Sequence, residues 1–293
     1  MRFFGGALLA LMVCGACVHS QGDPLLLPVI EKAPQKAYRY YLDISSSVVG
    51  FNLLVNGAEL LVVEGKTHAS QVDINDWMIS GENEIVISIA WPEGVKFAAG
   101  TSSASFKLFA NDTILGEYQW PVPAVPDTAE SYPYTMYETF KPAVFPRVLV
   151  ERAEKVISST GALPREDQEA IAVLAEDLRR AFTEKDLAEL ENLFKIKYSD
   201  LAAARFTTPA AIGAEMAELY GGLMEKEAYT VHPFYGRYGY FSTADDRLVK
   251  IVQGRIGFPE PALVITYREG RRTRRHDLDL YFARIDGRWV ILR

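Results

Sequence analysis

The sequence predicts an α+β fold: an N-terminal antiparallel β-sandwich, followed by a half in which helices precede an antiparallel sheet. Three observations predict it. Residues 37–120 consist of short β-rich runs and turns with almost no helical period. In residues 147–293, apolar side chains recur first at helical and then at strand spacing. A proline-rich segment, residues 121–146, lies between the two halves.

The first residues predict an export signal. Arg2 supplies a positive charge, and Phe3 to Val13 is an unbroken run of apolar residues and glycine. A membrane-spanning helix needs about 20 apolar residues, so this shorter run suits the apolar core of a signal peptide. We therefore predict that residues 1–17 are a signal peptide and that residues 18–36, which hold three prolines, are a tether.

The end of this signal peptide, Leu11 to Cys17, resembles a bacterial lipobox, in which a small residue precedes a cysteine that receives lipid. The resemblance implies an envelope lipoprotein that carries palmitate-type lipid on Cys17. Val18 after that cysteine favours the outer membrane, facing the periplasm. Two alternatives stay open: lipidation at Cys14, and ordinary cleavage near Ser20 that releases a soluble secreted or periplasmic protein.

Cysteine content and charge restrict the classes of function. Both cysteines lie in the leader, so the mature chain has neither an internal disulfide nor a thiol nucleophile. The net charge is −7, and Arg2 is the only charged residue of the leader, so the mature chain carries −8. An acidic chain repels phosphate backbones, so we expect no nucleic-acid partner. Attachment to a membrane is expected through the lipid alone.

The N-terminal half contains clear strand and turn signals. The pair Asn56-Gly57 separates two β-rich runs and predicts a hairpin. Ile85, Ile87 and Ile89 alternate along a later run and predict one buried strand face. The stretches 55–57, 72–77 and 81–85 together resemble turns of the jelly-roll sugar-binding-like domains. The resemblance implies a β-sandwich and identifies no ligand site.

The segment 121–146 predicts an interdomain linker, because proline at this density is compatible with neither a helix nor a central strand. It also holds several aromatic residues, which we expect to pack along a domain surface or to form an exposed docking strip. Two independently folding units, residues 37–120 and 147–293, are predicted to flank it.

The C-terminal half predicts helices and then strands. A helix is expected over Val148–Ser158, a longer one after Pro164, and a third that begins at Pro209 with Thr207 or Thr208 as its cap. Strands follow from Tyr229 onward, and they include one continuous strand over residues 278–285 and a final hairpin at Asp286-Gly287.

This order of elements, with the ending Asp286-Gly287-Arg288-Trp289-Val290-Ile291, resembles the nuclear transport factor 2-like (SnoaL-like) fold. The resemblance covers residues 167–293 and implies an α+β cone, in which a curved sheet wraps a helix and leaves a pocket. Some members of that family use an Asp or His in the pocket as an acid or base. The matching candidates for catalytic residues in this chain are His232, Asp277 and Asp279.

The aspartates also have a simpler interpretation. Asp277, Asp279 and Tyr281 share one face of the predicted strand, and leucine and phenylalanine occupy the other. If the apolar face is the core, the aspartates are solvated and have no catalytic role. No His, Cys or carboxylate group has the spacing of a metal site, and no cofactor-binding motif is found, so neither metal nor cofactor is expected.

Five arginines cluster around Gly270 at a predicted hairpin tip: Arg268, Arg271, Arg272, Arg274 and Arg275. A solvated tip is the simpler interpretation, but guanidinium groups also suit carboxylate and phosphate partners. Taken together, the residues favour a non-enzymatic envelope lipoprotein that binds a protein partner or a ligand. One alternative is an enzyme or small-molecule binder that uses the cone pocket, and another is a periplasmic immunity or inhibitor protein.

Overall fold

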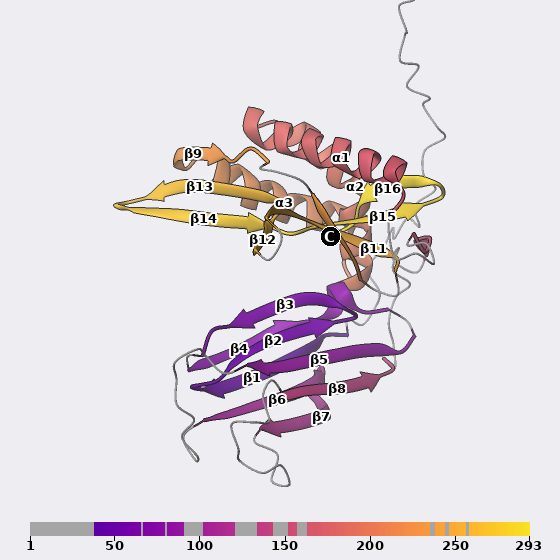
Figure 1. Ribbon diagram of the computed structural model, residues 1–293, viewed down its shortest axis with the longest axis vertical. Coiled ribbons are helices and arrows are strands. Elements are labelled where there is room, and N and C mark those ends of the chain that lie inside the picture. Colours follow the sequence, from indigo (N-terminus) through magenta and orange to yellow (C-terminus); the bar gives the residue numbers. More distant parts are fainter. Residues whose placement is uncertain are drawn as a thin grey trace, which may run out of the picture.

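The computed structural model describes residues 38–65, 67–79, 81–90, 102–120, 134–142, 152–156, 163–234, 238–243, 246–255 and 258–293. Within these residues the fold is α+β, as predicted, and every sheet is antiparallel. The N-terminal region consists mainly of strands, and the described α-helices all belong to the C-terminal region, which lies above it in Figure 1.

Two four-stranded sheets form the N-terminal region. Their strand orders are β4-β1-β6-β7 and β3-β2-β5-β8. The strands are β1 (Tyr40–Ser47), β2 (Gly50–Val55), β3 (Ala58–Val63), β4 (His68–Asp73), β5 (Asn83–Ala90), β6 (Ser103–Ala110), β7 (Thr113–Trp120) and β8 (Tyr134–Phe140). A short 3₁₀ helix, η1 (Asn75–Trp77), follows β4.

Both sheets contribute side chains to one core. Ile85, Ile87 and Ile89 are at most 2% exposed, which confirms the predicted buried face of β5. Phe51 from one sheet and Phe106 from the other meet edge to face, with ring centroids 5.1 Å apart. The turn at Asn56 has positive φ, as its hairpin prediction requires.

Strand β8 corrects the prediction for residues 121–146. Tyr134–Phe140 was assigned to the linker, but it pairs with β5 along its whole length. Pro133 and Pro142 flank the strand, and the residues between them include no proline that would interrupt the ladder. Since β8 is the last strand of its sheet, it occupies the edge position that a proline-flanked segment can take.

Three helices form one layer of the C-terminal region: α1 (Arg165–Glu184), α2 (Leu187–Ala204) and α3 (Pro209–Met224). Helix α1 begins directly after Pro164, and the Thr208 side chain accepts from the backbone N–H of Ala211 to cap α3, so both predicted starts are confirmed. The helix predicted over residues 148–158 is wrong for its described part, because residues 152–156 form neither α-helix nor strand.

Two further sheets pack against these helices. One has the order β10-β11-β15-β16 with β12 beside β11, and the other is β14-β13-β9. Their strands are β9 (Glu227–Val231), β10 (Gly239–Thr243), β11 (Leu248–Arg255), β12 (Phe258–Pro261), β13 (Leu263–Glu269), β14 (Arg272–Leu278), β15 (Leu280–Ile285) and β16 (Arg288–Ile291). Apolar residues of all three helices and of both sheets form one core.

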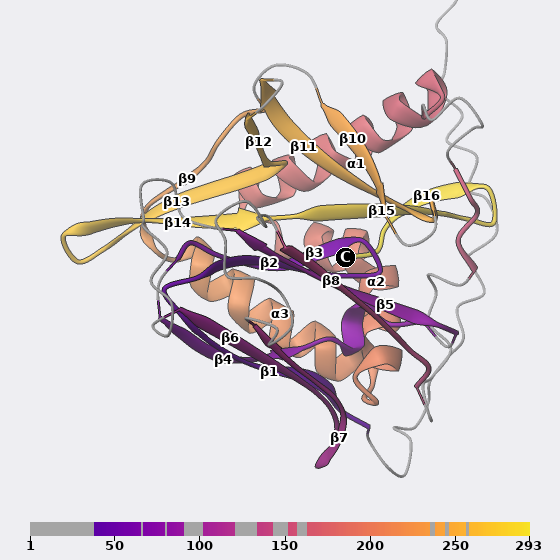
Figure 2. The ribbon, with the colours of Figure 1, turned by 60° about the horizontal axis from the view of Figure 1, so that its bottom comes forward.

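The single strand predicted over residues 278–285 is divided in two. Chain direction hardly changes at Asp279, so β14 and β15 follow nearly one line in Figure 1 and Figure 2, but they belong to different sheets. The predicted turn at Asp286-Gly287 is confirmed, since both residues have positive φ.

Candidate functional site

His232 makes two hydrogen-bonding contacts with β13 of the small sheet. Its backbone N–H donates to the Val264 carbonyl, and its Nε2 lies 2.9 Å from Thr266 Oγ1. The side chain is half-buried. Among the described residues, the side-chain hydrogen-bonding contact of His232 is therefore with a neutral hydroxyl group.

Asp277 and Asp279 lie on the exposed face. The Asp277 carboxylate is 2.6 Å from Arg275 Nε, and the Asp279 carboxylate is 3.0 Å from Lys250 Nζ. Their side chains are 42% and 40% exposed. The solvated interpretation therefore agrees with the structure for the two aspartates but not for Tyr281, which was predicted on the same face and is buried.

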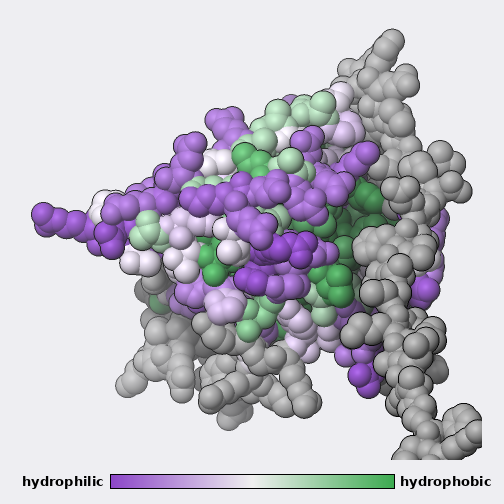
Figure 3. Space-filling view, turned by 90° about the horizontal axis from the view of Figure 1, so that it is seen from above, coloured by the Kyte–Doolittle hydropathy of each residue, from purple (hydrophilic) through white to green (hydrophobic). Residues whose placement is uncertain are grey.

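The arginine cluster lies on the β13–β14 hairpin, which projects beyond the helices in Figure 1. From above, the projection is strongly hydrophilic (Figure 3). Gly270 has a φ of 62° and forms the turn. The predicted arginine tip is thus the end of a protruding hairpin.

Three of the five arginines have acidic partners. Arg268 pairs with Glu227, Arg274 with Glu269, and Arg275 with Asp277, all at 3.0 Å or less. Among the described residues, Arg271 and Arg272 have no ion pair within 4.0 Å, and both are exposed. The positive charge that remains available for a partner therefore lies at the turn itself.

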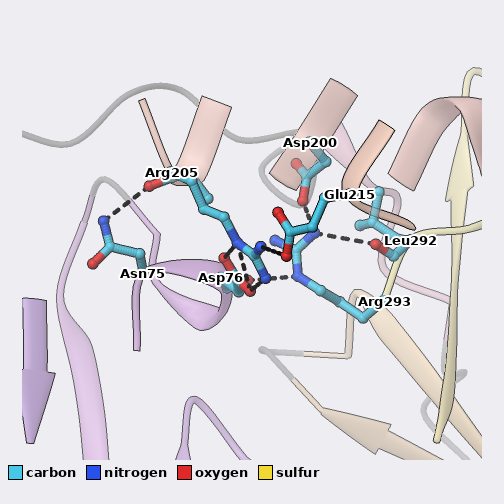
Figure 4. A network of polar contacts seen from close by, with 8 residues as sticks. Asn75, Asp76, Asp200, Arg205, Glu215, Leu292 and Arg293 are labelled. Carbon is cyan, nitrogen blue, oxygen red and sulfur yellow. Dashed lines mark hydrogen bonds and ion pairs between the residues drawn. The ribbon is translucent and has the colours of Figure 1, made fainter. Parts of the chain in front are cut away.

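A second polar cluster joins the two regions (Figure 4), and the sequence did not predict it. η1 approaches the end of α2 there. Asn75 is central to the contact: its Oδ1 accepts from the Tyr40 N–H at 2.6 Å, and its Nδ2 donates to the carbonyls of Tyr38 and Ala204. Since Asn75 is buried, these bonds satisfy a side chain that water does not reach.

Charged residues surround this contact. Arg205, just after α2, donates to both carboxylate oxygens of Asp76, with an Nη2–Oδ2 distance of 2.7 Å, and lies 3.4 Å from Glu215. Arg293 is buried, forms an ion pair with Asp200, and donates to the backbone carbonyl of Asp76. Asp76 of the N-terminal region thus contacts two arginines of the C-terminal region, and these arginines also pair with Glu215 and Asp200.

Burial lowers the pKa of two cations at this junction. It lowers the pKa of Arg293 to about 10. Burial, and next the positive charge of Arg293, lowers the pKa of Lys197 to about 8. Lys197 Nζ also lies 4.7 Å from the centre of the Phe194 ring. Both groups remain mainly protonated at pH 7.

An open cavity of about 440 Å³ lies beside the junction. It is lined by Tyr38, Arg39, Asp73, Asn75, Asp76 and Arg205. A second cavity, about 550 Å³, lies between α2 and α3 and is lined by small residues such as Ala210 and Gly213 with a polar rim. Volumes of a few hundred Å³ are typical of small-molecule sites.

The described residues contain no group of three or more metal-ligating side chains, and none of their helices is both long and apolar enough to span a membrane. No family model, curated protein or solved structure matches this chain.

Proposed function

We propose that this chain is a non-enzymatic binding protein of the bacterial cell envelope, and that it recruits an acidic protein partner through the tip of the β13–β14 hairpin. The observation that carries the proposal is the projection of Arg271 and Arg272 from the fold, both exposed and neither in an ion pair with another described residue. Guanidinium groups left in water at the end of a rigid ribbon are free to pair with carboxylates of another protein.

The surroundings of the candidate catalytic residues support a binding role. Asp277 and Asp279 already have cationic partners, and His232 contacts a hydroxyl group. An acid–base pair needs groups that converge on one reacting atom, and here each group makes a separate contact.

We also propose the finer architecture and the address of the protein. The two N-terminal sheets with a common core support an antiparallel β-sandwich, and the helices packed on strands support a cone-like C-terminal region. The lipobox-like residues support lipid on Cys17 and a location at the outer membrane, facing the periplasm. A fatty-acid analogue should label the wild type but not Cys17→Ser, and equal labelling of both would refute the anchor.

Site-specific photo-crosslinking in cells tests the hairpin proposal. A photoreactive amino acid at Thr273, exposed on the hairpin, should give a discrete crosslinked product with one partner. Replacing Arg271 and Arg272 with Ser should abolish that product. The matched control carries the photoreactive group at Asp112, an exposed turn residue of the N-terminal region.

Two results would contradict the proposal. One is a product of equal yield from Thr273 after the two arginines are replaced, since the contact would not need their charge. The other is the same product from Asp112, which would indicate contact with the protein surface in general.

A further inference from the structure

The junction cavity has a lining without net charge. Its two arginines, Arg39 and Arg205, are matched by two aspartates, Asp73 and Asp76. A simple anion would face the aspartates, and a simple cation would face the arginines. The lining therefore favours a ligand that carries both charges or neither.

The Arg39–Asp73 pair is the part of the lining that is open to a ligand. Arg39 uses only Nε to reach Asp73 Oδ1, at 2.5 Å. Within the described residues no hydrogen bond involves its two terminal nitrogens or the second carboxylate oxygen, Asp73 Oδ2. The side chains are 51% and 61% exposed, so a ligand can reach both.

Aromatic packing fixes the orientation of Arg39. Its guanidinium lies 4.6 Å from the centre of the Tyr41 ring. Tyr41 is itself stacked on Phe109, with ring centroids 4.9 Å apart and an interplanar angle of 3°. Supported on one side by Tyr41 and at Nε by Asp73, the two terminal nitrogens form a fork with the geometry of a carboxylate receptor.

On the opposite wall of the cavity, the polar side chains already have hydrogen-bond partners within the protein. Asn75 uses both side-chain atoms within the protein, and Arg205 and Asp76 already form a two-fold ion pair. Tyr38 lines the cavity and packs near Phe206, with ring centroids 6.4 Å apart, which adds an apolar surface. The free groups are thus a fork of donors beside a carboxylate oxygen, at the edge of an aromatic surface.

We propose that this cavity binds a free amino acid, a small zwitterion with adjacent carboxylate and ammonium groups. The ligand carboxylate lies on the terminal nitrogens of Arg39, and its ammonium group donates to Asp73 Oδ2. The ligand side chain packs toward Tyr38. The site is independent of the hairpin, and either proposal can fail without the other.

Calorimetric titration of the mature chain with each of the twenty L-amino acids tests this proposal. We expect saturable binding of at least one of them. An amide in place of its carboxylate, or an acetyl group on its nitrogen, should each weaken binding about 10- to 100-fold, because each removes one charge-assisted hydrogen bond.

Variants locate the site. Arg39→Gln, Asp73→Asn and Arg39→Lys should each weaken binding by a similar factor, the last because lysine keeps the charge but lacks the fork. The matched control is Lys107→Gln, which breaks the Lys107–Glu117 pair on the same sheet, at 37% and 40% exposure. It should bind as the wild type does. Melting temperatures of all four should stay close to the wild type, because exposed ion pairs stabilise little.

Three results would overturn the proposal. These are the absence of binding by every probe, equal affinity for the amidated or acetylated forms, and unchanged affinity in both Arg39→Lys and Asp73→Asn.

Discussion

Arginine side chains have opposite roles at two places in this protein, the junction between the N-terminal and C-terminal regions and the tip of the β13–β14 hairpin. At the junction, the Arg293 side chain is 4% exposed, pairs with the buried Asp200, and lies over the Trp77 ring. At the hairpin tip, Arg271 and Arg272 are exposed and form no ion pair within the described part of the chain, since the nearby Glu269 pairs with Arg274. A buried charge depends on its partner for stability, whereas a solvated charge can be lost without harm to the fold. The comparison indicates which arginines hold the structure and which are available for binding.

The largest effect is expected from breaking the buried pair. Arg293→Ala leaves the Asp200 carboxylate without its cation, so the free energy of unfolding should fall by about 3–5 kcal/mol. Urea unfolding at neutral pH measures this loss. The control Arg293→Met/Asp200→Leu removes both charges, and its free energy of unfolding should fall by less than that of Arg293→Ala. Equal losses in the single and double variants would show that the lone carboxylate is not the source of the effect.

A smaller, pH-dependent effect is expected at Lys197, whose pKa burial lowers from 10.5 to about 8. Between those pH values the unfolded chain binds more protons than the folded one, so wild-type stability should rise as the pH increases. Lys197→Met lacks this penalty and should be more stable than wild type at pH 7, by about 1–3 kcal/mol. Urea unfolding at pH 8 and at pH 10.5 should show that the difference in stability between Lys197→Met and the wild type becomes smaller as the pH rises. A difference that does not change with pH would refute the lowered pKa of Lys197.

The smallest effect is expected at the hairpin. Arg271→Ser/Arg272→Ser should change the free energy of unfolding by at most about 0.5 kcal/mol, because solvated charges contribute little. The comparison variant Arg268→Ser/Arg274→Ser removes the same charge but also two ion pairs, and should cost slightly more. Thermal unfolding of the two variants measures the difference. A large loss from Arg271 and Arg272 would mean that the tip supports the fold.

Local features of the fold could be predicted from sequence because they depend on neighbouring residues. Turns at Asn56 and Asp286 need only residues that tolerate positive φ. The helix that begins at Pro209 needs a cap and a stripe of apolar residues. We expect both Leu219 and Tyr220 in that stripe from the sequence, but only Tyr220 is buried, since 3.6 residues per turn place it below Met216, and Leu219 is 50% exposed.

The junction could not be predicted because its partners are far apart in sequence. Asn75 and Ala204 are separated by 129 residues, and Asp76 and Arg293 by 217. No local pattern marks such contacts. The five-arginine cluster was found from sequence, but three of the arginines have acidic partners, two of them on neighbouring strands and one on the same strand, so the available charge was overestimated. Strand β8 was missed because the density of proline around it outweighed its own β-rich residues.

The break at Asp279 has a mechanical consequence. β14 and β15 lie nearly on one line, and Tyr281, near the start of β15, packs against Trp77 of the N-terminal region with ring centroids 4.9 Å apart. A load applied at the hairpin tip therefore reaches that aromatic contact along extended backbone, with only one residue between the strands to absorb it. Force spectroscopy with a handle at Thr273 should release the Tyr281–Trp77 contact before either N-terminal sheet opens. Force on the hairpin is thus transmitted to the contact between the N-terminal and C-terminal regions.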